Sequence, residues 1–282
     1  MKKKFAAAFV AFALAMAVPA AAFADTENSI SAQPGGLPGQ STIDTSEQGN
    51  GMDSITIEGQ TNGVYANNFG TDIEASQQNA NNYAEAKGAA AAEKAQTAAE
   101  QKYASQKAQL EAELAYYQSI NNKQMVAQIN AQLAAIENAI AQAAEDAQAY
   151  WEQAAKNYNK TVGSFANING NEVINTFELQ GTSIGSSMTV TLVLDQSKYA
   201  GHTVTIIILN EDGTITKSTQ VVDANGCIKI QKNGFCVWTL VDCSGGLPAG
   251  TTVDGVSNTD AEKALSVAGN ATDKGTSPKT GF

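Results

Sequence analysis

The chain contains no arginine, a single histidine (His202) and only three cysteines among its 282 residues. Its basic residues are therefore 17 lysines, against 28 aspartates and glutamates, and the formal net charge is −11. Nucleic acids and anionic membrane surfaces are bound by basic patches that release counterions. The composition therefore argues against nucleic acid as a partner. So few histidines and cysteines also leave little material for a metal site or for nucleophilic catalysis.

Proline is scarce as well, and residues 39–247 contain none. The ends of the chain are instead rich in Gly, Ser, Gln, Thr and Asp, with few large apolar residues to offset chain entropy. We therefore expect residues 25–71 to form a flexible leader with one short strand at 54–58, which needs a sheet to pair with. Residues 244–282 are expected to form a flexible spacer.

The N-terminus has the three-part pattern of a secretory signal peptide. Residues 2–4 are lysines, residues 5–22 form an apolar run, and Ala22 and Ala24 are the small residues that signal peptidase accepts. We expect export, with residues 1–24 removed by cleavage after Ala24. An uncleaved N-terminal anchor is the alternative, which the short apolar run disfavours.

Residues 72–160 are predicted to be helical. Ala, Gln and Glu dominate, proline is absent, and Gly88 is the only glycine, so the summed helix propensity is high. In the second half, apolar residues alternate at spacings of three and four, which is the period of a coiled coil. This seam consists of Val126, Ile129, Leu133, Ile136, Ile140, Ala143, Ala147, Tyr150 and Ala154.

A break in the helical region is expected near Asn121. Asn121 can cap a second helix, with Gln124 completing a capping box. Ile120 and Met125 stand where a hydrophobic staple would place them. The pattern therefore predicts two helices that fold back on each other.

The two predicted helices cover residues 75–119 and 122–158. Antiparallel pairing about the break would place residues 88–92, which are small, opposite Tyr150 and Trp151. One unbroken helix in a parallel dimer is the alternative. Because the pair is rich in alanine and buries little apolar area, we expect either marginal independent stability or self-association into a larger helix bundle.

Residues 164–243 switch to a period of two, which is typical of strands. Asp-Gly or Asn-Gly pairs at 212–213, 225–226 and 233–234 separate successive runs and predict tight hairpins. Six short strands in this length indicate a small antiparallel β-sandwich. The predicted strands are 173–179, 188–194, 202–209, 214–222, 227–230 and 235–241.

The C-terminal residues resemble the LPxTG sorting motif of Gram-positive surface proteins, with Ser in place of the first Leu. In that family a sortase cuts between Thr and Gly and joins the Thr carboxyl group to the cell wall. The resemblance implies peptidoglycan as a partner through the sortase. The family has an apolar span and a basic tail after the motif, whereas only Phe282 follows here, so anchoring and release both stay open. The motif residues are Ser277, Pro278, Lys279, Thr280 (the implied acyl donor) and Gly281.

Residues 198–206, followed by Asp212-Gly213, resemble the β modules near the wall end of such surface proteins, in pattern and position. Some of those modules carry an internal Lys–Asn isopeptide bond. Glu178 and the nearby lysines are where such a bond would be sought, although the sequence indicates no pairing.

No catalytic motif stands out. A phosphate-binding loop and H-E-x-x-H are both absent from the sequence. His202 opens a predicted strand after a glycine, so we expect it to be a partly exposed strand-end residue. The chain is therefore expected to be no enzyme and to use no cofactor and no metal.

The three cysteines are Cys227, Cys236 and Cys243, and an odd number leaves at least one outside any internal disulfide. If 233–234 close a two-residue hairpin, Cys227 faces Leu240 and lies too far from Cys236 for a disulfide. Only a bond between Cys227 and Cys243 stays open, and we expect structural thiols.

The strand around Trp238 is apolar on both faces, which favours burial on both sides or packing against the helical region or a partner. If Trp238 is exposed instead, it forms a candidate binding patch with Tyr199.

The sequence thus predicts an α+β fold: a long Ala-rich helical hairpin over 72–160, followed by an antiparallel β-sandwich over 164–243, with flexible termini. The predicted function is that of an extracellular, secreted or cell-wall-associated structural or adhesive protein. The alternatives are a secreted carbohydrate- or protein-binding module and, third, an enzyme. The sequence names no surface ligand and no oligomeric state.

Overall fold

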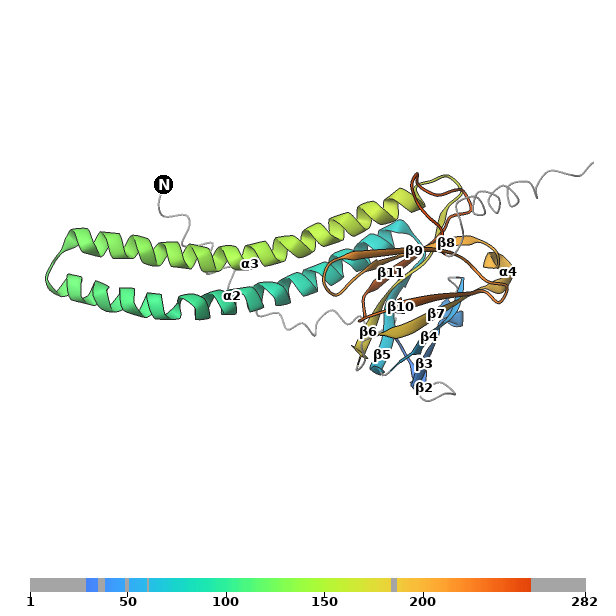
Figure 1. The fold of residues 1–282 in the computed structure, drawn as a ribbon, viewed down its shortest axis with the longest axis horizontal. Helices are drawn as coiled ribbons and strands as arrows, with labels where there is room; N and C mark the ends of the chain where they lie inside the picture. The colour runs from blue at the N-terminus through green and yellow to red at the C-terminus, as the bar shows by residue number, and fades with distance from the viewer. Residues whose placement is uncertain (1–28, 35–38, 49–50, 60, 184–186, 255–282) are drawn as a thin grey trace, which may run out of the picture. The chain divides into compact units, whose positions relative to one another are not determined.

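The computed structural model describes residues 29–34, 39–48, 51–59, 61–183 and 187–254 (Figure 1). It shows a mixed α+β protein with two long paired helices and antiparallel β-sheets. The chain divides into two compact units. We call Asn81–Ala155 the hairpin unit, and the described residues up to Ala80 and from Lys156 onward the β unit.

The helical pair consists of α2 (Ile73–Ser119) and α3 (Lys123–Ala166). The chain reverses direction between them (Figure 1). This confirms the predicted helical pair and rules out the unbroken helix. The predicted end of the second helix at residue 158 is wrong, because α3 continues for two further turns whose residues Val162 and Phe165 are buried in the β unit.

The turn between the helices closes α2 with backbone hydrogen bonds. Asn122 N–H donates to the carbonyl of Tyr117 at 3.0 Å, and Asn121 N–H donates to that of Gln118 at 3.1 Å. Asn121 has a φ of 58°, the left-handed conformation that this type of helix end requires. The predicted cap is therefore displaced by one residue: Asn122, whose Oδ1 accepts from Met125 N–H at 3.2 Å, caps α3.

The core of the hairpin unit is formed by Leu110, Ile129 and Ile136, each at most 6% exposed. Lys107 and Glu137 form an ion pair of 3.7 Å across the two helices. In these contacts, residues of α2 meet residues of α3 that lie about equally far from the turn along the chain. Antiparallel pairing about one turn requires this.

The small residues near Gly88 lie against Trp151, as predicted. A Cβ atom placed on Gly88 would lie 3.4 Å from the Trp151 Cβ, so the two helices approach closely here. Tyr150, however, was wrongly placed in the seam. It is 51% exposed, whereas Trp151 is 6% exposed and contacts Tyr83 edge to face. Between Ala147 and Ala154, the residue buried in the seam is therefore Trp151 and not the predicted Tyr150.

The β unit contains two antiparallel sheets. The six-stranded sheet has the order β1-β5-β6-β11-β8-β9, and the five-stranded sheet has the order β10-β7-β4-β3-β2. The strands are β1 (Ile30–Ser31), β2 (Gln33–Pro34), β3 (Gln40–Asp44), β4 (Met52–Glu58), β5 (Thr61–Gly70), β6 (Glu172–Ser183), β7 (Met188–Leu194), β8 (Thr203–Leu209), β9 (Ile215–Val221), β10 (Cys227–Lys232) and β11 (Val237–Asp242). Two short helices complete the unit: η2 (Ser46–Gln48) and α4 (Gln196–Tyr199).

The prediction of a flexible leader over residues 25–71 is wrong for the described residues. β4 pairs with β7, so the one strand expected at 54–58 does join the β region. β1, β2, β3 and β5 were missed, and β5 pairs with β6 along most of its length. The helical pair is therefore inserted between β5 and β6, and the β unit does not simply follow it.

Two of the three predicted hairpins are also wrong. The turn at Asp212-Gly213 does join paired strands, β8 and β9. The turns at 225–226 and 233–234 instead carry the chain between the two sheets, because β10 pairs with β7 whereas β9 and β11 lie in the six-stranded sheet. Cys227 consequently does not face Leu240, which is paired with Ile206 and Asn175.

One hydrophobic core is shared by residues of both sheets. Every residue of β8 and β11 is buried, so both faces of the six-stranded sheet are covered at its centre. The second face is covered within the β unit by the first turns of α2 and the last turns of α3, where Ser76 and Tyr158 contact Thr239 of β11. The predicted two-sided burial of this strand is confirmed.

The first residues of the spacer predicted to begin at residue 244 are bound to the β unit. Asp254 N–H donates to the Thr219 carbonyl of β9 at 2.7 Å, and the Asp254 carboxylate accepts from Ser218 Oγ at 2.5 Å. Val253 beside it is 4% exposed. Residues 244–254 therefore belong to the β unit, and the rest of the predicted spacer lies outside the described residues.

Candidate functional site

Trp238 and Tyr199 are both buried, so the exposure on which the predicted binding patch depended is not found. Trp238 is completely buried and stacks on Phe177 with 6.0 Å between ring centroids. Tyr199 is 2% exposed, and its hydroxyl donates to Glu172 Oε1 at 3.2 Å. Both rings are used for packing, because β11 is a central strand and α4 closes the end of the core.

The two terminal sites lie outside the described residues. These are Ala22 and Ala24 of the signal-peptidase prediction, and residues 277–281 of the sortase-like motif. Among the residues that the structure describes, none of the helices is both long enough and apolar enough to span a membrane.

His202 belongs to a polar cluster at the end of the β unit. Its Nδ1 lies 2.9 Å from Asp242 Oδ2 and 3.2 Å from Ser244 Oγ, and Ser244 Oγ donates to Asp242 Oδ1 at 2.7 Å. A Ser-His-Asp relay needs the hydroxyl and the carboxylate on opposite ring nitrogens. Here both contact the same nitrogen, so the arrangement differs from such a relay, and it joins the start of β8 to the end of β11.

A lysine–carboxylate pair lies beside this cluster. Lys198 Nζ is 2.7 Å from Glu172 Oε1, and its ammonium lies 4.7 Å from the centroid of the Tyr199 ring. The hydrogen bond from Lys198 lowers the pKa of the Glu172 carboxyl, and the same bond raises the pKa of Lys198. Burial raises the pKa of the Tyr199 hydroxyl. Each group therefore keeps its ordinary charge near neutral pH, which is typical of a structural contact.

The cysteines form no disulfide bond, so the bond between Cys227 and Cys243 that the sequence left open is not made. Burial raises the pKa of the thiols of Cys227 and Cys243. A raised pKa lowers the fraction of reactive thiolate. Among the described residues, no group of three His, Cys, Asp or Glu side chains is placed to hold a metal ion.

Glu178, where the resemblance to wall-proximal modules directed the search for an isopeptide bond, is bound by amide side chains. Its oxygens accept from Asn68 Nδ2 at 3.3 Å and from Gln180 Nε2 at 2.6 Å. Gln180 in turn accepts a hydrogen bond from the Tyr65 hydroxyl. This polar cluster ties β5 to β6.

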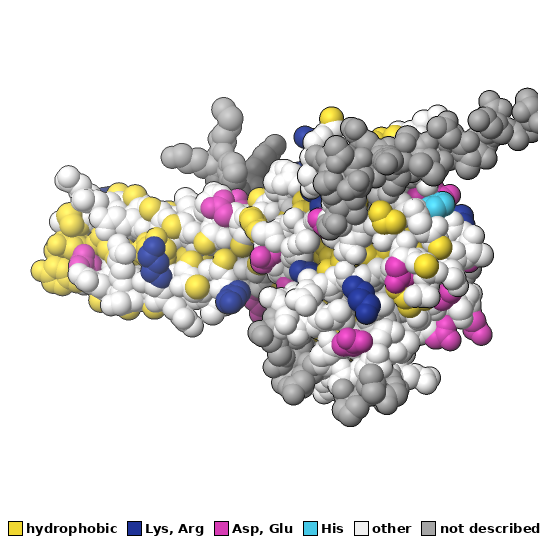
Figure 2. Space-filling model, turned by 45° about the vertical axis from the view of Figure 1, so that its right-hand side comes forward, with side chains coloured by type: hydrophobic (Ala, Val, Ile, Leu, Met, Phe, Trp, Pro, Cys, Tyr) yellow, Lys and Arg dark blue, Asp and Glu magenta, His cyan; other side chains and the backbone are white. Residues whose placement is uncertain are grey.

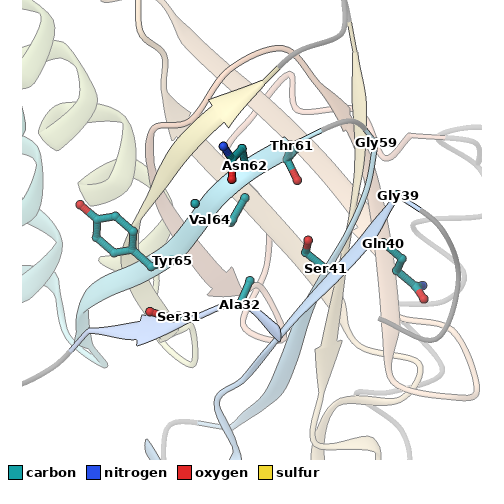
Figure 3. Close-up of a pocket in the computed structure, with 11 residues that line it drawn as sticks. Ser31, Ala32, Gly39, Gln40, Ser41, Gly59, Thr61, Asn62, Val64 and Tyr65 are labelled. Carbon is teal, nitrogen blue, oxygen red and sulfur yellow. The ribbon is translucent and has the colours of Figure 1, made fainter. Parts of the chain in front are cut away.

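A cleft of about 610 Å³ opens at one edge of the β unit, between β1 and β5 of one sheet and β3 of the other (Figure 3). Ala32 and Val64 point toward one another at its base, whereas Tyr65 and Gln40 point away (Figure 3). None of the lining residues is charged, so the cleft offers hydroxyl, amide and backbone groups over a small apolar floor. The lining residues are Ser31, Ala32, Gly39, Gln40, Ser41, Gly59, Thr61, Asn62, Gly63, Val64 and Tyr65.

Hydrophobic side chains also gather at the tip of the hairpin unit, at the left of Figure 2. Tyr116 and Ile120 are 59% and 52% exposed, and they are the most exposed large hydrophobic residues that the structure describes. Tyr117 contacts Tyr116 edge to face at 5.2 Å. The turn that follows is fixed by the hydrogen bonds of Asn121 and Asn122, so the tip holds these side chains on ordered backbone.

The sequence patterns missed this tip surface. Ile120 was interpreted only as part of a staple, and Tyr116 was not singled out. The available signal was their spacing: they stand four residues apart, outside the row of Leu110, Leu114 and Tyr117 that packs in the hairpin core. Apolar residues at this spacing on the outer face of a helix form a row of their own, separate from the row that packs against the partner helix.

No protein-family model, no curated protein and no solved structure matches the chain. Its function must be inferred from its own residues.

Proposed function

We propose that this chain is an exported, non-catalytic protein of a Gram-positive cell surface, with a structural or adhesive role. Export is supported by the signal-peptide pattern that ends at Ala22 and Ala24, and wall attachment by the LPxTG-like residues 277–281. Between these signals, the helical hairpin presents a contact surface and the β unit supports it.

The observation that carries the proposal is the exposure of Tyr116 and Ile120 on the ordered tip of the hairpin unit. Apolar side chains of this size are usually buried, and exposed groups of them mark contact surfaces. Tyrosine in particular is enriched among the residues that dominate binding energy. A rigid helical pair that ends in such residues is suited to contact a partner, because both side chains are more than half exposed.

The polar groups of the β unit support a non-catalytic role. The only histidine of the chain shares one ring nitrogen between Asp242 and Ser244, and Lys198 and Glu172 neutralise each other. Catalytic groups usually have a pKa that is shifted toward the working pH. The shifts of Glu172 and Lys198 go in the opposite direction.

Expression of the full chain in a Gram-positive host with an active sortase tests the proposal. We expect a mature N-terminus at Asp25 by mass spectrometry, and part of the protein released only by digestion of the wall. A Thr280→Ala variant should move that part to the medium, whereas the exposed Thr97→Ala in the hairpin should leave it in the wall. Intact chain with Met1 in the cytoplasm would contradict export, and secretion without any wall-bound fraction would contradict anchoring alone.

A second candidate function is binding of neutral glycans by the cleft between β1, β5 and β3. The absence of charged lining residues favours it, because hydroxyl and amide groups bind uncharged polar ligands. Titration of the 15N-labelled protein with neutral oligosaccharides should shift the amide resonances of Thr61 and Ser41, and those of the distant Asp212 turn should not move. Shifts at neither place would contradict a glycan site.

A further inference from the structure

The chain crosses from one sheet of the β unit to the other within residues 30–34, which we call the strap. β1 is the edge strand of the six-stranded sheet, β2 is the edge strand of the five-stranded sheet, and Ala32 alone separates them. The strap therefore spans the side of the β unit where β5 and β3 would otherwise be the outermost strands.

Few backbone contacts hold the strap in place. Two of its residues are paired with β5 and two with β3. Ala32 N–H also donates to the Val64 carbonyl at 2.8 Å. Pro34 has no N–H group and so donates no hydrogen bond to β3. By contrast, β4 is paired on both sides, with β3 and with β7, along most of its length.

The strap also buries little apolar surface. Ile30 and Ala32 pack against the core but are only partly buried, and Ser31 and Gln33 are exposed. Each hydrogen bond makes a small net contribution to stability, and the conformational entropy lost on ordering a residue offsets much of it. Segments with so few buried apolar contacts open locally. The strap should therefore open while the rest of the β unit stays folded.

The strap forms one wall of the cleft between β1, β5 and β3. Ser31 and Ala32 line the cleft, and Ala32 points toward Val64 of β5 at its base (Figure 3). Release of the strap removes Ala32 from this apolar floor and takes away the hydroxyl group of Ser31. The cleft is therefore complete only while the strap is bound to both sheets.

We propose that the strap is a movable wall of the cleft, which is released without unfolding of the β unit and is held in place by a ligand. A ligand that contacts Ser31 or Ala32 stabilises the bound strap, and the bound strap strengthens ligand binding by the same factor, because such coupling is reciprocal. The role of the ligand rests on the second candidate function, in which the cleft binds neutral glycans. The opening of the strap does not depend on that function.

Hydrogen exchange of the chain from Asp25 onward tests the opening. The protection factor of the Ala32 amide should be at least about 100-fold lower than that of the Ile57 amide in β4, because only Ala32 is released by local opening. Ile30→Ser removes a side chain that holds the strap, and it should lower the protection of Ala32 at least about threefold without changing Ile57. Val221→Ser, on the edge strand β9, is the matched control and should change neither amide. Equal protection of Ala32 and Ile57 would overturn the proposal.

A reversible disulfide tests whether release of the strap causes this exchange. Gln33→Cys and Thr42→Cys are made together, in a background in which Cys227 is replaced by serine. The two residues are directly paired and lie outside the lining of the cleft. Such pairs in antiparallel strands have Cα atoms about 4.5–5.5 Å apart, which a disulfide can bridge. Oxidation should give a covalent monomer in which Ala32 is protected at least about tenfold more than in the reduced protein.

The matched control for this lock is a disulfide between Thr56→Cys and Thr191→Cys, which joins β4 to β7 in the same sheet. It should leave the protection of Ala32 unchanged. Equal protection of Ala32 in the oxidised and reduced forms of the Gln33–Thr42 lock would overturn the proposal. A covalent dimer would overturn it as well, because the strap of one copy would then be bound to β3 of another.

Neutral oligosaccharides test the role of the ligand. At ten times its dissociation constant, a bound oligosaccharide should slow the exchange of Ala32 about tenfold, because it binds only while the strap is in place. An oligosaccharide that shifts the resonances of Thr61 and Ser41 but leaves the exchange of Ala32 unchanged would overturn the coupling. If no oligosaccharide shifts these resonances, the glycan function is contradicted, and the measurements on the strap itself decide whether it is a movable wall.

Discussion

The Tyr158 hydroxyl donates a hydrogen bond of 2.7 Å to Thr239 Oγ1, and this bond joins the last turns of α3 to the central strand β11. Thr239 also contacts Ser76 Oγ at 2.7 Å and Thr176 Oγ1 at 3.1 Å. All four side chains are completely buried. Burial raises the pKa of Tyr158 far above its ordinary range, so the hydroxyl stays protonated. Thr239 is therefore the centre of a dry polar network that fixes both helix ends on the six-stranded sheet.

Replacing Thr239 should destabilise the β unit more than replacing Tyr158. Tyr158→Phe removes the bond to Thr239 and a longer one of 3.4 Å to the Ile207 carbonyl, but leaves Thr239 bound to Ser76 and Thr176, so we expect a loss of about 1 kcal/mol. Thr239→Val leaves the hydroxyls of Tyr158 and Ser76 without their main partner in a dry interior, which should cost about 2–3 kcal/mol. Chemical denaturation measures both values. Tyr116→Phe, at an exposed tyrosine, is the control and should change nothing measurable.

Position 245 leaves no room for a side chain, so only glycine should be tolerated there. A Cβ atom at Gly245 would lie 2.1 Å from the carbonyl oxygen of Asn169, a rigid backbone atom. Gly245→Ala should therefore displace the segment after β11 and destabilise the protein by about 1–3 kcal/mol. Gly163→Ala is the matched control. Its new Cβ would meet only the end of the Asn167 side chain, and alanine is favoured in a helix interior, so it should be neutral or slightly stabilising. Equal losses for the two variants would contradict this explanation.

The period-two pattern predicted the strands of the region from β6 to β11, although β8 and β11 are buried along their whole length and do not alternate regularly. β5 was missed because Thr61–Gly70 is rich in Asn and Gly, which are poor strand formers. Its pairing comes from a partner more than 100 residues away, as with Tyr65 opposite Gln180 and Ala66 opposite Leu179. Such a strand is specified by tertiary contacts, and local propensity does not reveal it.

The turn residues also show that local sequence does not determine which strands pair. Asn225-Gly226 forms a tight local turn, in which Asp223 Oδ1 accepts from the N–H groups of Asn225 and Cys227 at 2.8 Å each. The local chemistry was thus correctly identified. It does not determine whether the next strand returns beside the previous one or crosses to the other sheet, which depends on what each strand buries. The candidate site depended on the same kind of information: Trp238 is buried in the core shared by the two sheets, where it stacks on Phe177, and that packing is set by strands distant in the sequence.

The contact between Lys198 and Glu172 should make a small contribution to stability that depends on pH. The folded pKa of Glu172 lies below its ordinary value of 4.5, so this stability is present above pH 4.5 and is lost as the pH falls through the folded pKa. The folded pKa of Lys198 is raised above 10.5, so its contribution is fully present below pH 10.5. Both side chains are about half exposed, which limits the effect to under about 1 kcal/mol.

Lys198→Met tests this dependence. The difference in unfolding free energy between wild type and variant should be constant from about pH 5 to pH 9 and should vanish as Glu172 is protonated at lower pH. Lys217→Met on the edge strand β9 controls for the loss of one positive charge. A difference for Lys198→Met that persists at pH 2 would indicate that packing of the lysine stem on Tyr199 is responsible.

Asn121 holds the hairpin turn in a conformation that glycine adopts more easily. With a φ of 58° at this position, a side chain costs free energy, and a β-branched one costs most. Asn121→Gly should therefore be neutral or stabilise the hairpin unit by up to about 1 kcal/mol, whereas Asn121→Val should destabilise it by about 1–2 kcal/mol. Asn122→Ala removes the cap on Met125 N–H and should cost about 1 kcal/mol. Hydrogen exchange of the amides of residues 110–136 measures each change within the hairpin unit. If Asn121→Gly accelerated exchange as much as Asn121→Val, the left-handed conformation would not be what selects asparagine at the turn.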